Sequence, residues 1–144
     1  MTLEKLAKYT KELKVLYVED EKVVREATSM ILLNLFQDII LCEDGEQGYD
    51  TFIKNQDSID LIITDIMMPK LNGIDMIDKI RDINKDVPVI IFSAYEDKNN
   101  HINSVKLNIS YYLNKPIELD TFKDIVAKVV KKIVIQKIHN EFNN

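Results

Sequence analysis

The chain has 144 residues, of which 46% are hydrophobic and 30% charged, and it carries a net charge of −5. This length supports a single globular domain and leaves no room for a second one of ordinary size. Only three glycines and three prolines are present, which argues against disorder, collagen and repeat-rich β architectures. The acidic balance also disfavours direct binding to nucleic acid.

No segment approaches the roughly 18 uninterrupted apolar residues that a membrane span needs, and the N-terminal residues lack the apolar core of a signal peptide. Cys42 is the only cysteine, so an internal disulfide cannot form, which fits a reducing compartment. We therefore expect a cytoplasmic protein without membrane insertion.

Short apolar runs alternate along the chain with stretches in which apolar residues recur every three or four positions. The runs are too short and too rich in β-branched residues to be helices. They predict strands at 14–18, 39–42, 60–64, 87–92 and 110–113. The intervening stretches predict helices with one buried face. In the first of these helices the periodicity assigns Val23, Ala27 and either Met30 or Ile31 to that face.

Apolar strands that are each followed by a helix indicate a parallel sheet covered on both faces. We therefore predict an α/β fold, a doubly wound sheet of five parallel strands. Such sheets bind ligands beyond the carboxyl ends of their strands. Glu19 and Asp20 follow the first strand, Asp65 follows the third, Ser93 the fourth and Lys115 the fifth. The unusual polar residues therefore all fall at one edge.

The carboxylates of Glu19, Asp20 and Asp65 would converge if the first and third strands are neighbours. Close like charges raise pKa values unless a cation compensates, and Mg²⁺ accepts a few carboxylate oxygens together with water. An ammonium from Lys115 and a hydroxyl from Ser93 would suit a transferring phosphoryl group. A carboxylate can itself accept that group as an acyl phosphate. Each residue alone also fits a simpler role at a helix start, a turn or a solvated surface.

Four motifs occupy these strand ends: VLYVEDE at 15–21, LIITDIMMPKLNG at 61–73, VIIFSA at 89–94 and YYLNKP at 111–116. Together they resemble the receiver domain of two-component response regulators, across residues 14–133. The resemblance implies a flavodoxin-like (βα)5 fold with strand order 2-1-3-4-5. It also implies a cis peptide bond before Pro116.

The same resemblance implies a role for each site residue. Asp65 would be the phosphoacceptor, and Lys115 and Ser93 would hold the phosphoryl oxygens. Ser93 and the aromatic Tyr112 would form the switch that moves on activation. The Mg²⁺ ligands would be three carboxylates and one backbone carbonyl, from Glu19, Asp20, Asp65 and Met67.

The implied function is a phosphorylation-activated switch that takes its phosphoryl group from a histidine kinase or a phosphotransfer protein. It would assist its own phosphotransfer and dephosphorylation without being a turnover enzyme on an external substrate. We expect activation to change the face formed by a weak helix at 96–107, the strand at 110–113 and the last helix, and so to control a partner or an output domain.

Three alternatives remain open. A pseudo-receiver would act as an interaction module without phosphorylation, but all the site residues are present, which counts against it. A flavodoxin-like redox protein would need a phosphate-binding loop where Glu19-Asp20-Glu21 stands, and those acids would repel a phosphate. A haloacid-dehalogenase-type phosphatase would need a second acid at Met67.

Two departures from the family pattern concern the rate of self-dephosphorylation. Met67 and Tyr95 stand two residues after Asp65 and Ser93, where side chains of the family flank the path of the attacking water. An apolar and a bulky aromatic residue there offer no base to orient that water, so we predict slow self-dephosphorylation.

Both ends exceed the usual receiver. Residues 1–13 are expected to form an N-terminal helical extension, and residues 134–144 to extend the last helix. The extension contains Ile135, Ile138 and Phe142. Apolar residues exposed there indicate a partner surface, for a homodimer or an output domain, or simply a frayed helix end.

Overall fold

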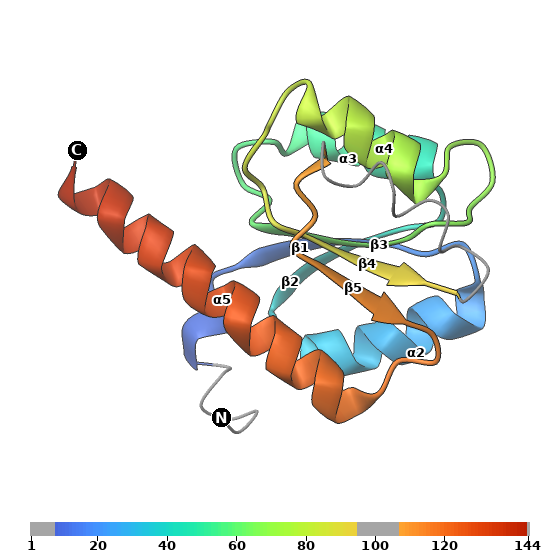
Figure 1. Ribbon diagram of the computed structural model, residues 1–144, viewed down its shortest axis with the longest axis horizontal. Helices are drawn as coiled ribbons and strands as arrows, with labels where there is room; N and C mark the ends of the chain where they lie inside the picture. The colour runs from blue at the N-terminus through green and yellow to red at the C-terminus, as the bar shows by residue number, and fades with distance from the viewer. Residues whose placement is uncertain (1–7, 95–106, 144) are drawn as a thin grey trace.

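The computed structural model describes residues 8–94 and 107–143, and a parallel five-stranded sheet in the order β2-β1-β3-β4-β5 forms its centre (Figure 1). The strands are β1 (Lys14–Val18), β2 (Asp38–Cys42), β3 (Leu61–Asp65), β4 (Val89–Ser93) and β5 (Tyr111–Asn114). The predicted fold class and strand order are therefore confirmed. Tyr95 and the helix expected at 96–107, apart from its last residue, lie outside the described residues.

Helices cover both faces of the sheet. They are α2 (Lys22–Leu33), α3 (Gly45–Lys54), α4 (Gly73–Arg81) and α5 (Leu119–Phe142). Figure 1 shows α2 and α5 on one face and α3 and α4 on the other. The starts of α3 and α4 are capped by side chains, because Asp44 accepts from the backbone N–H of Gln47 and Asn72 accepts from that of Asp75.

The core forms two apolar layers, one on each face of the sheet. Alternate residues of β1 serve different layers, with Tyr17 facing α2 and α5, and Val18 facing α3 and α4. Every residue of β3 and β4 is buried. Phe92 makes edge-to-face contacts with Tyr17 and Phe122, which ties β4 to β1 and α5. The packing fixes the strands whose carboxyl ends carry the polar motifs.

The prediction for the buried face of α2 is wrong for Val23 and Ala27, and of the two alternatives Met30 and Ile31 only Ile31 meets the core. Val23 and Met30 are 79% and 70% exposed, and Ala27 is exposed as well, whereas Ile31 is half-buried and packs against the apolar layer on this face. The buried residues of this helix are Ser29 and Leu32. Periodicity failed here because α2 carries apolar residues on two sides, and its buried side includes polar groups that bond to backbone carbonyls.

The two ends of the described chain differ in how they meet the core. Residues 8–10 are helical, Leu13 is buried, and the hydroxyl of Thr10 donates a hydrogen bond to the carbonyl oxygen of Leu35. At the other end α5 continues past Ile133, its last buried residue, and projects from the body (Figure 1). Among the described residues, none of the helices combines the length and apolar content needed to cross a bilayer. The division of the chain at 13/14 and 133/134 stays a prediction.

Candidate functional site

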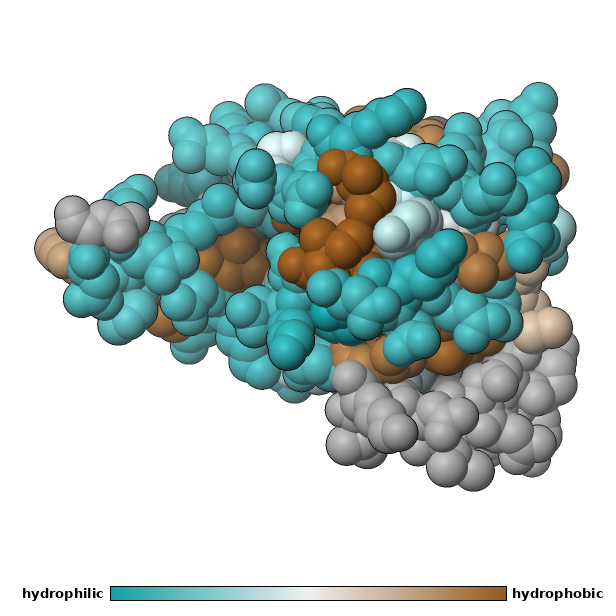
Figure 2. Space-filling view, turned by 90° about the horizontal axis from the view of Figure 1, so that it is seen from above, coloured by the Kyte–Doolittle hydropathy of each residue, from teal (hydrophilic) through white to brown (hydrophobic). Residues whose placement is uncertain are grey.

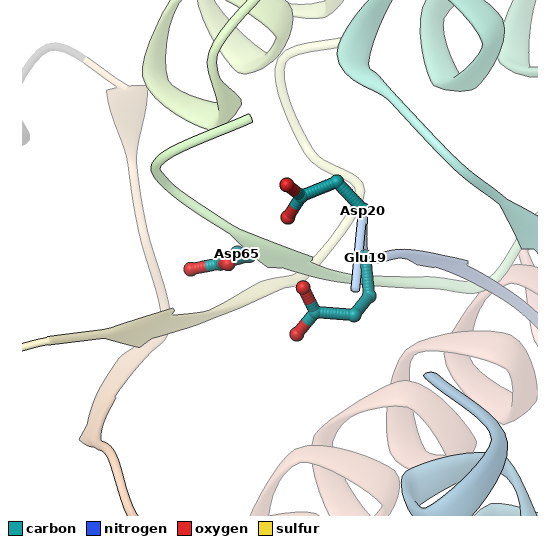
Figure 3. A group of neighbouring side chains, drawn as sticks. All are labelled: Glu19, Asp20 and Asp65. Carbon is teal, nitrogen blue, oxygen red and sulfur yellow. The ribbon is translucent and has the colours of Figure 1, made fainter. Parts of the chain in front are cut away.

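Three carboxylates meet at the carboxyl ends of β1 and β3. Glu19 and Asp20 follow β1 directly and Asp65 ends β3, and the two strands are neighbours in the sheet. One carboxylate oxygen from each residue lies within 4.8 Å of the others. Figure 3 shows the three groups turned toward a common space. Glu19 and Asp65 are buried and Asp20 is half-buried, so water screens their mutual repulsion poorly.

The crowding of negative charge affects the pKa of one of the three carboxylates. Burial, and then the charge of Asp65, raises the pKa of Glu19 to about 7, while the nearby ammonium of Lys115 opposes the rise. A cation placed among the three carboxylates would relieve this repulsion. The donor set consists of hard carboxylate oxygens alone, which is the set that Mg²⁺ prefers, so these residues fit a magnesium ion.

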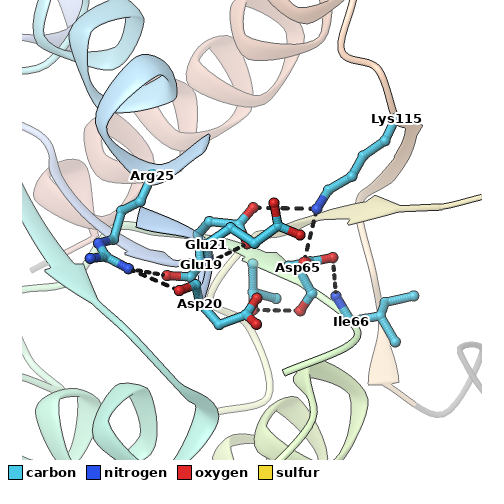
Figure 4. A network of polar contacts seen from close by, with 8 residues as sticks. Glu19, Asp20, Glu21, Arg25, Asp65, Ile66 and Lys115 are labelled. Carbon is cyan, nitrogen blue, oxygen red and sulfur yellow. Dashed lines mark hydrogen bonds and ion pairs between the residues drawn. The ribbon is translucent and has the colours of Figure 1, made fainter. Parts of the chain in front are cut away.

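Lys115, in the loop between β5 and α5, contacts two of the carboxylates. Its Nζ lies 2.8 Å from Oδ2 of Asp65 and 3.3 Å from Oε1 of Glu19 (Figure 4). Burial alone would lower the pKa of Lys115, but the hydrogen bond and charge of Asp65, together with Glu19, raise it. Its backbone N–H donates to the carbonyl oxygen of Ser93 at 2.9 Å, and its peptide bond to Pro116 is cis. The protonated lysine therefore stands fixed at the site.

The carboxylate of Asp65 is held at both of its oxygens. Oδ1 accepts a hydrogen bond from the backbone N–H of Ile66 at 2.8 Å, and Oδ2 accepts from Lys115. The start of α4 closes tightly over this turn, because Gly73 N–H donates to the carbonyl oxygen of Ile66 at 2.7 Å. A Cβ atom at Gly73 would lie only 2.0 Å from the carbonyl oxygen of Asp65, so this close approach requires glycine.

The remaining predicted residues lie at the same edge or beside it. Ser93 ends β4 and is fully buried, and its hydroxyl has no hydrogen-bond partner among the described residues. Tyr112 lies in β5 and packs against the apolar layer on the α3 and α4 face. The side chain of Met67 is 59% exposed. The functional roles of these residues stay predictions.

Arg25 is a site residue that the sequence reasoning missed. It reaches back from α2 and donates through Nη1 to the carbonyl oxygens of Glu19 at 2.8 Å and Asp20 at 3.4 Å (Figure 4). Its Nη2 lies 3.5 Å from a carboxylate oxygen of Glu43. It thus anchors the backbone that presents two of the carboxylates. The sequence pattern did not identify Arg25, because the apolar periodicity of α2 assigned the side of the helix that carries Arg25 to solvent.

A doubly wound sheet in the order 2-1-3-4-5, with an acidic cluster beyond β1 and β3 and a lysine beyond β5, defines the receiver class of signalling domain. Comparison with known proteins agrees. The chain belongs to the response regulator receiver domain family, whose sequence model matches residues 15–127.

Relatives carry this domain within longer proteins. The chain is 30% identical over 117 residues to the transcriptional regulatory protein DltR of Streptococcus agalactiae, covering 81% of this chain and 50% of the relative. It is 26% identical over 134 residues to the 3',5'-cyclic-nucleotide phosphodiesterase regA of Dictyostelium discoideum, covering 91% of this chain and 17% of that enzyme. The chain thus spans half the length of the first relative and a small part of the second.

Two solved structures match this chain over nearly their whole length. A response regulator receiver domain protein from Clostridium thermocellum superposes with a TM-score of 0.79 at 26% identity, covering 86% of this chain and 98% of that one. The N-terminal domain of an uncharacterized protein from Wolinella succinogenes has a TM-score of 0.78 at 35% identity, covering 87% and 98%.

Proposed function

We propose that this chain is a phosphorylation-controlled switch in which Asp65 accepts a phosphoryl group from a histidine kinase or a phosphotransfer protein. Receiver domains are signalling modules, and this chain has the family's fold. The observation that carries the proposal is the setting of Asp65. Its carboxylate is hydrogen-bonded to Lys115 at 2.8 Å and lies beside the carboxylates of Glu19 and Asp20.

Phosphotransfer is supported by the charges around Asp65. An oxygen of its carboxylate forms a bond to phosphorus as the P–N bond of the donor's phosphohistidine breaks and the imidazole leaves. Lys115 sets its ammonium against the negative charge spread over the phosphoryl oxygens. The ligands for Mg²⁺ would be carboxylates of the acidic cluster and the carbonyl oxygen of Met67, and the ion would supply further positive charge to these oxygens.

The switch is supported by the buried hydroxyl of Ser93. An unpartnered buried hydroxyl costs free energy, and an acyl phosphate on Asp65 would bring acceptor oxygens to the edge where Ser93 lies. A shift of Ser93 toward that phosphate would leave room for the ring of Tyr112 to follow. Because Tyr112 belongs to β5, this motion would alter the face of β5 and α5 and so a partner or an output domain. We place this activity in the cytoplasm, where histidine kinases present their phosphoryl groups.

Phosphorylation with a small-molecule donor tests the proposal. With acetyl phosphate and Mg²⁺, mass spectrometry should find one phosphoryl group on Asp65. EDTA or Asp65→Asn should abolish the modification. Asp78→Asn is the matched control, because Asp78 is exposed on α4 and the change removes the same charge away from the site. A folded protein that gains no phosphoryl group on Asp65 and binds no Mg²⁺ would refute the switch and favour the interaction-only pseudo-receiver.

A further inference from the structure

The helix α5 is apolar on two opposite sides. One side packs on the sheet through residues that end at Ile133. The other carries Ile135, Ile138 and Phe142, which are 56%, 47% and 86% exposed. Their spacing of three and four residues places them on one side, about 140–200° around the helix from Ile133, and these three residues form an exposed apolar ridge. Figure 2 shows hydrophobic side chains on the projecting end of α5, at the left, among hydrophilic ones.

An apolar groove runs along the same helix toward its N-terminal end and shares Ile135 with this ridge. It has a volume of about 390 Å³ and lies between Tyr9, from the N-terminal segment, and six residues of α5, which are Ala127, Lys128, Val130, Lys131, Val134 and Ile135. Lys128 and Lys131 contribute to its walls, and side chains of this type can line apolar space with their alkyl stems while their ammonium groups stay in water. One helix therefore presents both an exposed apolar ridge and an apolar groove.

We propose that α5 pairs antiparallel with α5 of a second copy of this chain, so that each Phe142 fills the groove of the other copy. With the two-fold axis between Ile135 and Ile138, these two residues pack against each other across the axis. The same register sets Phe142, four residues beyond Ile138, opposite Lys131, four residues before Ile135. Lys131 lines the groove, so both ridges and both grooves are occupied in one closed, symmetric contact.

Charge favours the antiparallel direction. In a parallel pair Lys131 would face Lys131 of the second copy, and Phe142 would face Phe142 and leave both grooves open. In the antiparallel pair Glu141, next to Phe142, comes near Lys131 of the second copy, so opposite charges flank the apolar contact. The contact involves only the distal part of α5, so we expect a weak dimer that depends on concentration. It does not rest on phosphorylation of Asp65.

Sedimentation equilibrium over a wide concentration range, without a phosphodonor, tests the pairing. Phe142→Glu should raise the dimer dissociation constant by about tenfold or more, the effect of removing an aromatic side chain that fills a pocket of the partner. Met30→Glu is the matched control, since Met30 is an exposed apolar residue on α2 and its change should leave the constant unaltered. A chain that stays monomeric throughout, or a dimer equally sensitive to both changes, would overturn the proposal.

Spin labels test the direction of the pair. Asp124 is exposed near the start of α5, about twelve residues from the proposed axis. At 1.5 Å per residue, labels on Asp124→Cys, in a Cys42→Ala background, should lie about 38 Å apart along an antiparallel pair. A parallel pair would instead bring the labels within about the width of two helices. Pulsed electron resonance separates these distances, and a short one would overturn the antiparallel arrangement.

Discussion

Replacing Glu19 with glutamine should stabilise the metal-free protein, by an amount that grows with pH. Glu19 is fully buried beside Asp65, and these two causes raise its pKa from the ordinary 4.5 to about 7. Its ionised form is therefore unfavourable in the folded state when no cation is bound. Glutamine keeps the shape of the side chain and removes the charge.

The size of the gain follows from the pKa shift. One pKa unit corresponds to about 1.4 kcal/mol, so a rise from 4.5 to about 7 sets an upper limit of about 3–4 kcal/mol on the cost of ionising Glu19. The variant loses the attraction between Glu19 and Lys115, which lie 3.3 Å apart, although Lys115 keeps Asp65 as a partner. We expect a net gain of about 1–3 kcal/mol at pH 8.

The sign of the pH dependence is set by which state binds the proton more tightly. Between pH 4.5 and 7 the folded protein retains the Glu19 proton that the unfolded chain has released. The natural chain therefore loses stability as pH rises through this window, and above pH 7 the loss is complete. The Glu19→Gln variant lacks this loss, so the two proteins should diverge as pH increases.

Urea unfolding in EDTA at pH 5 and pH 8 measures the difference. The two free energies of unfolding should nearly coincide at pH 5 and separate at pH 8, with the variant more stable. Glu26→Gln, which removes an exposed charge on α2, is the control and should show little effect at either pH. A Glu19→Gln variant that is no more stable at pH 8, or a difference equal at both pH values, would refute the account of the acidic cluster.

Three further outcomes follow from the site. Gly73→Ala should destabilise the protein by about 2 kcal/mol or more in urea unfolding, since its Cβ would lie 2.0 Å from the carbonyl oxygen of Asp65; an unchanged midpoint would contradict this. Met67→Asn should speed the loss of phosphate from the labelled protein severalfold, because a polar group there can orient water, and unchanged rates would count against slow dephosphorylation. Arg25→Ala should weaken Mg²⁺ binding, measured by titration, while leaving every carboxylate of the cluster in place, with partial recovery in Arg25→Lys; equal affinities would exclude a positioning role.

The sheet and its functional edge could be predicted because both depend on patterns that run along the chain. The apolar runs predicted every strand to within two residues of its position at either end, and the first coincides with β1, Lys14–Val18. Parallel strands bring their carboxyl ends to one edge, so residues as distant as Glu19 and Lys115 could be expected to meet there. Once the fold had been predicted, the positions of the candidate site residues followed from the order of the strands.

The supports of the site could not be predicted in the same way, because they act through the backbone. Arg25 and Ser29 lie on the inward side of α2 since their polar groups donate to carbonyl oxygens, a reason that hydropathy does not express. Val23 and Met30 fit the apolar period equally well and are exposed. On a helix with apolar residues on two sides, periodicity identifies both sides, but tertiary packing determines which of them is buried. The same reasoning applies to α5, whose outer apolar side requires a partner to explain it.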